Sequence, residues 1–429
     1  MSLRGARGIV GLFKGRKSDD NPHVDFGLAL TSPDALADPY PTLHRMRCED
    51  PAHYSETLGA WFLTRYADVL QAFREPRLSS DRTRFVIDAQ LGSRDRAIVK
   101  DFERVQKGTM LNKDGAEHFR LRRLANHGFT PALLDGMRPK IQRVADELLD
   151  RAGASGRMDI VANYAQPLPI IVICELFGIP AEDRHRFRQW ADDSVKFFGL
   201  TRGDVEADAR AANEATVNFQ CYFLDLLEER RLRPPGNDLL SLLIAGQGEG
   251  RLSAEEVTAQ CQLILNAGHV TTIHQLGNAV HAFLEHPEQL RRLRSDPSLI
   301  NSAVEEVLRY DPAAPLVRRV AAADMEIGGK TIREGELVFL AVAAANHDPE
   351  VFANPDCFDI GRAENRHIAF GSGAHACLGS GLTRRELEIG LMTLVRRLPR
   401  LGLDPESRPR RRCSSFMFRG FDTFPVVTS

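Results

Sequence analysis

One very long helix is the feature that most constrains how this chain can fold. Residues 253–285 show the apolar spacing of a helix, and Ser253 with Glu256 forms the pattern of a capping box at its start. Pro287 stands just beyond the end, where a proline is tolerated. At about 1.5 Å per residue this helix spans roughly 50 Å. It is therefore long enough to cross the whole molecule, and the other elements must pack around it.

The middle of this helix has an unusual composition. Residues 267–272 read Ala-Gly-His-Val-Thr-Thr, and both glycine and β-branched residues weaken a helix. Small side chains there would let a bulky group approach closely. The Thr271 hydroxyl can also bond back to the Ala267 carbonyl and loosen the helix locally. The alternative interpretation is an imperfect core helix that binds nothing.

Helical patterns dominate the rest of the chain, and strand signals are few. Besides the long helix, we expect helices at residues 134–151, 182–197, 205–232 and 382–398. We expect strands at residues 61–64, at 325–332 paired with 336–342 through a turn at 333–335, and at an edge position in 424–427. The expected fold class is mostly α with small β-sheets (α+β).

Composition excludes several classes of protein. Among 429 residues, 56 Lys plus Arg against 58 Asp plus Glu leave a net charge of −2, so no nucleic-acid partner is expected. No apolar run of about 18 residues exists, so no transmembrane anchor is expected. Seven cysteines without a Cys-x-x-Cys pair indicate reduced thiols in a cytoplasmic protein. Residues 1–34 are expected to form a mobile basic tail and lead-in, and residues 35–429 a single domain.

A cysteine lies in a glycine-rich loop near the C-terminus. Residues 370–379 read Phe-Gly-Ser-Gly-Ala-His-Ala-Cys-Leu-Gly. The glycines at 371 and 373 permit a tight turn close to a ligand, and Cys377 precedes the helix expected at 382–398. The N–H groups and dipole of a helix N-terminus stabilise a thiolate, which is a metal ligand. A lone cysteine is otherwise most often a small buried apolar residue.

This loop resembles the haem-binding loop of the cytochrome P-450 family, Phe-Gly-x-Gly-x-His/Arg-x-Cys-x-Gly, at every fixed position. The resemblance extends from about residue 38 to residue 427 and indicates the soluble bacterial branch. It implies the family's triangular-prism fold, in which the long helix crosses haem b (iron protoporphyrin IX). It also implies that Cys377 is the proximal ligand of the haem iron and that His375 reaches a haem propionate.

The same resemblance assigns further haem contacts. His118 and Arg122, at i and i+4 on one helical face, and Arg319 match positions that bind the propionates. The other expected contacts are Phe370, Gly371, Gly379 and Ala267.

Two further segments match the family behind the haem. Glu306 and Arg309, at i and i+3 on a helix, match its Glu-x-x-Arg ion pair, for which a structural role is expected. Residues 346–349 and 355–359 resemble the segment before the cysteine loop, with His347 where the family commonly has arginine.

The long helix departs from the family at one position. The family's motif is Ala/Gly-Gly-x-Asp/Glu-Thr-Thr/Ser, and Val270 replaces the acid that supports proton delivery. Valine cannot carry a proton, whereas Thr271 keeps its hydroxyl. The residues expected on the oxygen side of the haem are Gly268, Val270, Thr271 and Thr272. Protons are expected from these hydroxyls, from ordered water or from the substrate, because His269 should face another direction.

The expected function is a haem-thiolate monooxygenase that uses O2 to hydroxylate or epoxidise a medium or large apolar small molecule, in secondary metabolism. By resemblance, its substrate pocket is lined by Phe85, Leu265, Asn266, Val270, Val317, Phe416 and Met417. Two alternatives stay open. One is a specialised haem-thiolate catalyst, driven by peroxide, coupling substrates oxidatively or taking protons from its substrate. The other is a non-catalytic haem- or ligand-binding protein.

Electrons are expected from other proteins. No flavin or ferredoxin module is visible in the sequence, so a separate ferredoxin and ferredoxin reductase are expected to serve a monomeric enzyme. The docking surface for an acidic ferredoxin is expected to carry Arg120, Arg123, Arg366 and Arg384.

Overall fold

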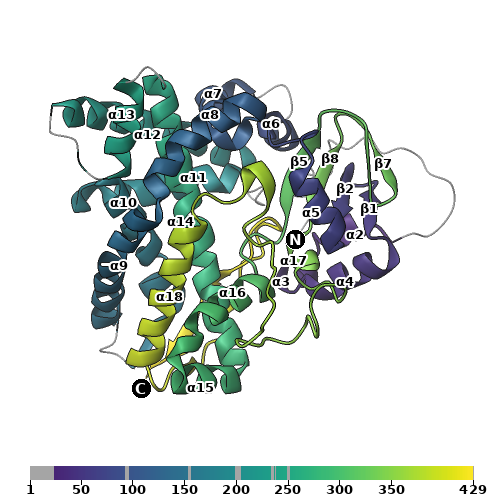
Figure 1. Cartoon of the computed structure of the whole chain (residues 1–429), viewed down its shortest axis with the longest axis vertical. Helices are drawn as coiled ribbons and strands as arrows, with labels where there is room; N and C mark the ends of the chain where they lie inside the picture. The colour runs from purple at the N-terminus through teal and green to yellow at the C-terminus, as the bar shows by residue number, and fades with distance from the viewer. Residues whose placement is uncertain are drawn as a thin grey trace.

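Helices make up most of the structure, and a small sheet lies at one side of them (Figure 1). This computed structural model describes residues 24–91, 96–152, 156–198, 204–232, 236, 238–248 and 252–428. The first 23 residues of the expected basic tail lie outside this set. Within the expected lead-in, Phe26 and Leu30 are buried in a core cluster with Phe62 and Phe339.

The described α-helices vary from one turn to 32 residues. They are α2 (Phe26–Ala29), α3 (Pro33–Ala37), α4 (Tyr40–Glu49), α5 (Tyr66–Arg74), α6 (Thr83–Leu91), α7 (Lys100–Gly108), α8 (Gly115–Asn126), α9 (Pro131–Ala152), α10 (Pro167–Phe177), α11 (Arg184–Phe198), α12 (Val205–Arg231), α13 (Leu239–Gly248), α14 (Ala254–Glu285), α15 (Pro287–Ser295), α16 (Ile300–Tyr310), α17 (Val342–Ala345) and α18 (Ser380–Arg397).

The strands form four small sheets. The largest has the order β1-β2-β8-β5-β3, with β1 (Ala52–Ser55), β2 (Ala60–Leu63), β8 (Leu337–Leu340), β5 (Val317–Ala321) and β3 (Leu78–Ser79). Its β2–β8 pair is parallel, with Ala60 opposite Leu337, and its other pairs are antiparallel. The smaller sheets are β6 (Met325–Ile327) with β7 (Lys330–Ile332), β10 (Arg410–Arg411) with β11 (Phe421–Thr423), and β4 (Arg157–Asp159) with β12 (Pro425–Val427) and β9 (Gly402–Leu403).

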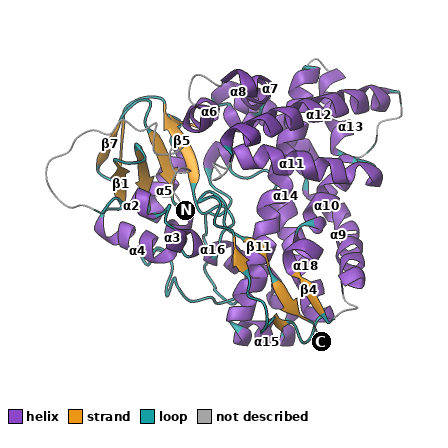
Figure 2. Cartoon of the chain, turned by 180° about the vertical axis from the view of Figure 1, so that it is seen from behind, coloured by secondary structure: helices purple, strands orange, loops and turns teal. Residues whose placement is uncertain are grey.

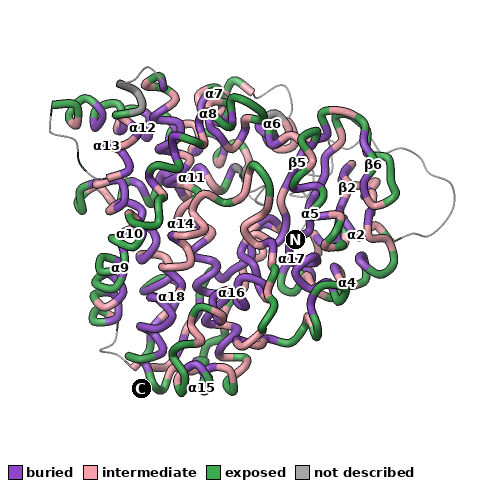
Figure 3. The backbone as a smooth tube through the Cα atoms, viewed as in Figure 1, coloured by how far each residue is buried: buried purple, intermediate pink, exposed green. Residues whose placement is uncertain are grey.

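Helix α14 is the long helix that the sequence predicts, and its capping box is present. Ser253 accepts from the Glu256 N–H, and the Glu256 carboxylate accepts from the Ser253 N–H. The first half of α14 packs in one core cluster with α10 and α12, and its second half packs in another with α9, α16 and α18. Residues 266–272 lie between the two clusters. Outer helices such as α9 and α15 instead carry exposed turns (Figure 3).

The expected α+β class and the expected helices are confirmed, whereas two strand predictions are wrong. Residues 325–332 pair with themselves as the β6–β7 hairpin, because Gly328 and Gly329 take positive φ values of 60° and 70° and form the turn. β8 pairs with β2 and β5 instead. β12 is the central strand of its sheet and not an edge, since it pairs with β4 on one side and β9 on the other; this sheet lies near the C-terminus, where β4 is labelled in the view from behind (Figure 2). No helix among the described residues is both long and apolar enough to span a bilayer.

Candidate active site

The cysteine loop folds into a tight turn against α5. Gly371 and Gly373 have φ values of 69° and 72°, which other residues rarely adopt. A β-carbon at Gly373 would lie 2.6 Å from the carbonyl oxygen of Phe73, so only glycine lets the loop pack there. The Cys377 N–H donates to the Phe370 carbonyl at 2.8 Å, and α18 begins three residues later.

Cys377 presents its side chain to an internal cavity. The residue is exposed on the cavity side, although protein surrounds it on its other sides. Burial raises the pKa of its thiol, whereas the N–H groups of Gly379 and Ser380 act to lower it. The guanidinium groups of Arg122 and Arg384 act in the same direction. These groups would stabilise the thiolate once a metal cation replaces the proton.

The cavity has a volume of about 320 Å³ and lies between α14, α8, β5 and the cysteine loop. Its wall is mostly apolar. The sequence analysis did not identify much of this wall, which includes Phe73, Met110, Phe129, Ile173, Leu263 and Ile264. These residues come from five separate segments. Their spacing along the chain carries no signal that they meet.

Basic side chains also line this apolar cavity. Arg122 and Arg319, which the sequence predicts, lie there with Arg82, which it does not. Arg319 is 5% exposed, and one of its Nη atoms donates to the Arg318 carbonyl at 2.8 Å. Burial lowers the pKa of Arg319 to about 10, and it lowers the pKa of Arg122 as well. Among the described residues, neither Arg122 nor Arg319 forms an ion pair with a carboxylate.

His118 and His375, both expected at the propionates, meet at the same rim. Their ring centroids are 4.0 Å apart. His375 Nε2 lies 3.2 Å from Asp114 Oδ1, which orients that ring. Burial would raise the pKa of Asp114, but hydrogen bonds from His375 and Ser79 lower it to about 2. Burial, His375 and Arg122 lower the pKa of His118 to about 4, and its buried Nε2 has no hydrogen-bond partner in the described structure.

This set of groups fits haem b. The apolar wall suits a porphyrin, and Cys377 offers a sulfur to its iron. The half-buried Arg122 and the buried Arg319 lack anionic partners within the described residues, so two propionates would satisfy them.

Helix α14 places three of the predicted residues at the cavity, namely Ala267, Gly268 and Thr271. The Thr271 hydroxyl donates to the Ala267 carbonyl at 3.2 Å, as the sequence indicates. Thr272 is 1% exposed, lies outside the wall and donates to the Gly268 carbonyl at 3.3 Å. Thr271 is therefore the threonine hydroxyl of this pair that faces the cavity.

The neighbouring helix positions face away from it. Val270 is 8% exposed and lies outside the cavity wall. His269 is buried, and its Nδ1 lies 2.7 Å from the Leu265 carbonyl on the same helix. Gln275, one turn after Thr271, lines the cavity. The i+4 spacing from Thr271 was a signal for Gln275 that the sequence analysis did not use.

Of the expected substrate-pocket residues, only Val317 lies in the described cavity wall. The other expected residues do not line this cavity, and their role in substrate binding stays a prediction: Phe85, Leu265, Asn266, Val270, Phe416 and Met417. Leu265 is fully buried in the core cluster between α14 and its neighbours, because it points opposite to Ala267. Phe85, Phe416 and Met417 pack in the core cluster beside the five-stranded sheet.

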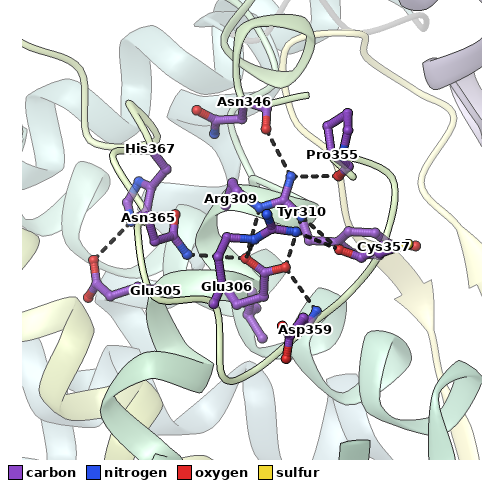
Figure 4. A network of polar contacts seen from close by, with 12 residues as sticks. Glu305, Glu306, Arg309, Tyr310, Asn346, Pro355, Cys357, Asp359, Asn365 and His367 are labelled. Atoms are coloured by element: carbon purple, nitrogen blue, oxygen red, sulfur yellow. Dashed lines mark hydrogen bonds and ion pairs between the residues drawn. The ribbon is translucent and has the colours of Figure 1, made fainter. Parts of the chain in front are cut away.

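Glu306 and Arg309 form the expected ion pair, and both side chains are fully buried (Figure 4). The Arg309 Nε and one Nη each donate to the Glu306 carboxylate at 2.8 Å. The remaining Arg309 donors reach the carbonyls of Asn346, Pro355 and Cys357 at 2.7 to 3.1 Å. All five N–H donors of this guanidinium are thus used.

Three of the four arginines expected at the docking surface are neutralised within the chain. Arg120 pairs with Glu256 at 2.5 Å, Arg384 with Glu305 at 2.6 Å, and Arg366 with Glu364 at 3.1 Å. Arg123 is exposed. Next to Arg120 on α8, the Phe119 side chain is 68% exposed. This surface is therefore less positive, and more apolar, than the sequence indicates.

Comparisons with known proteins agree with this site. A family profile described as Cytochrome P450 matches residues 86–418. A biotin biosynthesis cytochrome P450 from Bacillus subtilis (strain 168) is 36% identical over 93% of this chain and 98% of its own length. A 6-deoxyerythronolide B hydroxylase from Saccharopolyspora erythraea is 38% identical over 92% of this chain and 98% of its own length. The crystal structure of P450BioI with acyl carrier protein ligated to hexadec-9Z-enoic acid has a TM-score of 0.85 at 35% identity, covering 92% of this chain and 100% of that one.

Proposed function

Because the chain belongs to the cytochrome P450 family, and is thereby a haem monooxygenase that uses O2, we propose that it hydroxylates or epoxidises a medium or large apolar small molecule of secondary metabolism. The observation that carries this proposal is the apolar cavity that Cys377 and Thr271 both line. Apolar walls with few polar groups bind apolar ligands. The names of two relatives, which refer to biotin biosynthesis and to 6-deoxyerythronolide B, support a biosynthetic role.

Each group at the cavity has a proposed task. Cys377 would hold the haem iron, and Arg122, Arg319 and the two histidines His118 and His375 would bind the propionates. Bound haem supplies O2 activation, which a thiolate ligand favours. The apolar wall would exclude water and orient the substrate.

Proton supply is the step at which this chain departs from its family. Val270 lies outside the cavity wall and can neither donate nor accept a proton. We therefore assign the hydrogen-bond donor of the oxygen side to Thr271, which must rotate its hydroxyl away from the Ala267 carbonyl to donate.

A second candidate function follows from the valine at position 270. Without an acid at 270, the enzyme would use peroxide, couple substrates oxidatively, or take protons from a hydroxyl of its substrate.

A separate ferredoxin and ferredoxin reductase are the proposed electron donors of a monomeric, cytoplasmic enzyme. All seven cysteines are free, which supports a reducing compartment. The proposed docking surface combines the exposed Phe119 and Arg123 on α8 with Arg366, whose side chain is 75% exposed. Because Arg120 and Arg384 are paired, we expect only a modest weakening of reduction by salt.

The haem ligand is tested by Cys377→Ser, with Cys48→Ser on α4 as the matched control. The thiolate–iron–CO complex has a red-shifted Soret band, which should vanish in Cys377→Ser and persist in Cys48→Ser. A persisting band in Cys377→Ser would show that another residue binds the iron.

The two reaction types are separated by product formed per NADPH consumed, with a surrogate ferredoxin and reductase. Thr271→Ala should lower this coupling sharply, whereas Val270→Glu should retain haem and change the coupling. A parallel assay with peroxide alone tests the second candidate. Product formation with peroxide but not with NADPH would replace the proposed monooxygenase route by that candidate.

A further inference from the structure

Three potential metal ligands from separate segments meet on the sheet side of the protein, away from the haem cavity. They are His44 on α4, His347 just after α17, and Asp356 in the loop that follows. Their ligand atoms all lie within 4.8 Å of one another. Asp356 Oδ1 is 2.9 Å from His347 Nδ1 and 3.2 Å from His44 Nε2. A single carboxylate oxygen thus faces two imidazole nitrogens.

The hydrogen bonds of His347 decide which of its nitrogens carries a proton. His347 Nε2 lies 2.9 Å from the Tyr310 carbonyl, which can only accept, so Nε2 carries the hydrogen. In the neutral ring the other nitrogen, Nδ1, therefore carries a lone pair. Its Nδ1 then directs a lone pair toward the carboxylate oxygen of Asp356. Two lone pairs at 2.9 Å repel each other unless a cation lies beside both.

His44 contributes a buried ring nitrogen that has no hydrogen-bond partner. Its Nε2 is buried and forms no hydrogen bond in the described structure, although Asp356 lies close by. Burial lowers the pKa of this ring. The ring itself is held beside His347, with centroids 5.9 Å apart. An unsatisfied buried nitrogen destabilises the folded chain, and a bound ion would remove that cost.

The spacings match those of neighbouring ligands on one metal ion. Zinc–nitrogen and zinc–oxygen bonds of about 2.0–2.2 Å, at angles near 90–110°, place neighbouring ligand atoms roughly 2.9–3.5 Å apart. The observed 2.9 and 3.2 Å fall within this range. The Tyr310 carbonyl holds the far nitrogen of His347, as outer partners of ligating histidines do. The Asp356 side chain is 62% exposed, which leaves room for water as a further ligand.

We propose that His44, His347 and Asp356 form a surface site for a divalent transition-metal ion, with Zn²⁺ as the best match to two imidazoles and one carboxylate. The ion would link α4 to the segment that Arg309 holds through the carbonyls of Asn346 and Pro355. Its effect is on the stability of that segment, because binding to the folded chain alone shifts unfolding by mass action.

The test uses the haem-loaded protein after treatment with a chelator. Zn²⁺ is titrated against a chromophoric competitor, with His44→Gln and Asp356→Asn as the test variants. The control is His127→Gln, which changes an exposed histidine on another part of the surface. We expect one Zn²⁺ per chain, an affinity at least tenfold weaker in both test variants, and no change in the control. X-ray absorption at the zinc edge should show nitrogen and oxygen ligands without sulfur.

Three outcomes would overturn the proposal. Equal affinity in the wild type and both test variants would place the zinc elsewhere, and sulfur in the absorption spectrum would point to a cysteine. Zinc should also raise the melting temperature of the wild type and of the control, but not that of the test variants. An absence of zinc binding to folded wild-type protein would show that the three residues form a polar network only.

Discussion

The two groups of buried charge in this protein are built in opposite ways. In the Glu306 network, the carboxylate accepts from Arg309, Arg362, Asn365 and the Asp359 N–H, and Arg309 uses every donor it has (Figure 4). At the cavity, Arg319 is almost as deeply buried but forms no ion pair with a carboxylate among the described residues.

The difference distinguishes buried charges that stabilise the fold, as in the Glu306 network, from a buried charge that can bind a ligand, as at Arg319. A buried ion is costly unless its partners are present, so a satisfied cluster has nothing left to bind. A buried cation without an anion persists only where something else compensates its burial. In this family the bound haem, with its two propionates, is the compensating group.

The largest expected effect comes from breaking the satisfied cluster. Arg309→Met should lower the free energy of unfolding by about 3–5 kcal/mol, because it removes the cation paired with the buried Glu306 carboxylate and leaves the carbonyls of Asn346 and Pro355 without this donor. Arg45→Met is the control, since its ion pair with Glu49 is exposed and should contribute less than about 0.5 kcal/mol. Chemical denaturation measures both. Equal losses would mean that burial and pairing do not distinguish the two sites.

A smaller effect, on haem rather than on folding, is expected from Arg319→Met. Loss of a hydrogen bond to a charged group costs about 1.5–3 kcal/mol, so haem should dissociate roughly 10- to 150-fold faster. Transfer of haem to an excess of a scavenging protein measures this rate. The haem-free chain should unfold within about 1 kcal/mol of the wild type, because the substitution removes no ion pair. If haem-free Arg319→Met lost as much stability as Arg309→Met, Arg319 would stabilise the fold in the same way as the Glu306 network.

The change that is smallest at each single step, one pH unit at a time, concerns Glu386 on α18. This side chain is fully buried, neither of its oxygens has a hydrogen-bond partner in the described structure, and burial raises its pKa well above the usual value. As pH rises above the pKa of the unfolded chain, the unfolded state loses this proton while the folded state keeps it. Stability should therefore fall with pH, by up to about 1.4 kcal/mol per unit, until the folded pKa is reached.

Glu386→Gln keeps the shape and removes the titration. Denaturation at pH 5, 6, 7 and 8 should show the variant gaining stability relative to the wild type at each step. Parallel curves for the two proteins would mean that the Glu386 carboxyl is satisfied and titrates normally.

The sequence predicted elements that carry local signals and missed contacts that carry none. The capping box and apolar spacing located α14, and the glycine pattern located the cysteine loop. The sequence-based pairing of residues 325–332 with 336–342 was wrong, although Gly328 and Gly329 mark the turn of the β6–β7 hairpin. Arg82 and Phe73 line the cavity only because distant segments of the chain pack together. No residue pattern near them in the sequence predicts that they line a cavity.

Packing of the cysteine loop against α5 has a consequence for how the chain is made. About 300 residues separate Phe73 from Gly373, whose contact closes the cavity. At about 5–20 residues per second, a ribosome needs roughly 15–60 s to produce the second partner after the first. Once α8 and then α14 are made, the apolar wall that they form with α5 still lacks its last side and is open to water until the cysteine loop follows. The nascent chain must therefore be shielded from aggregation, and haem can enter only after nearly the whole chain has left the ribosome.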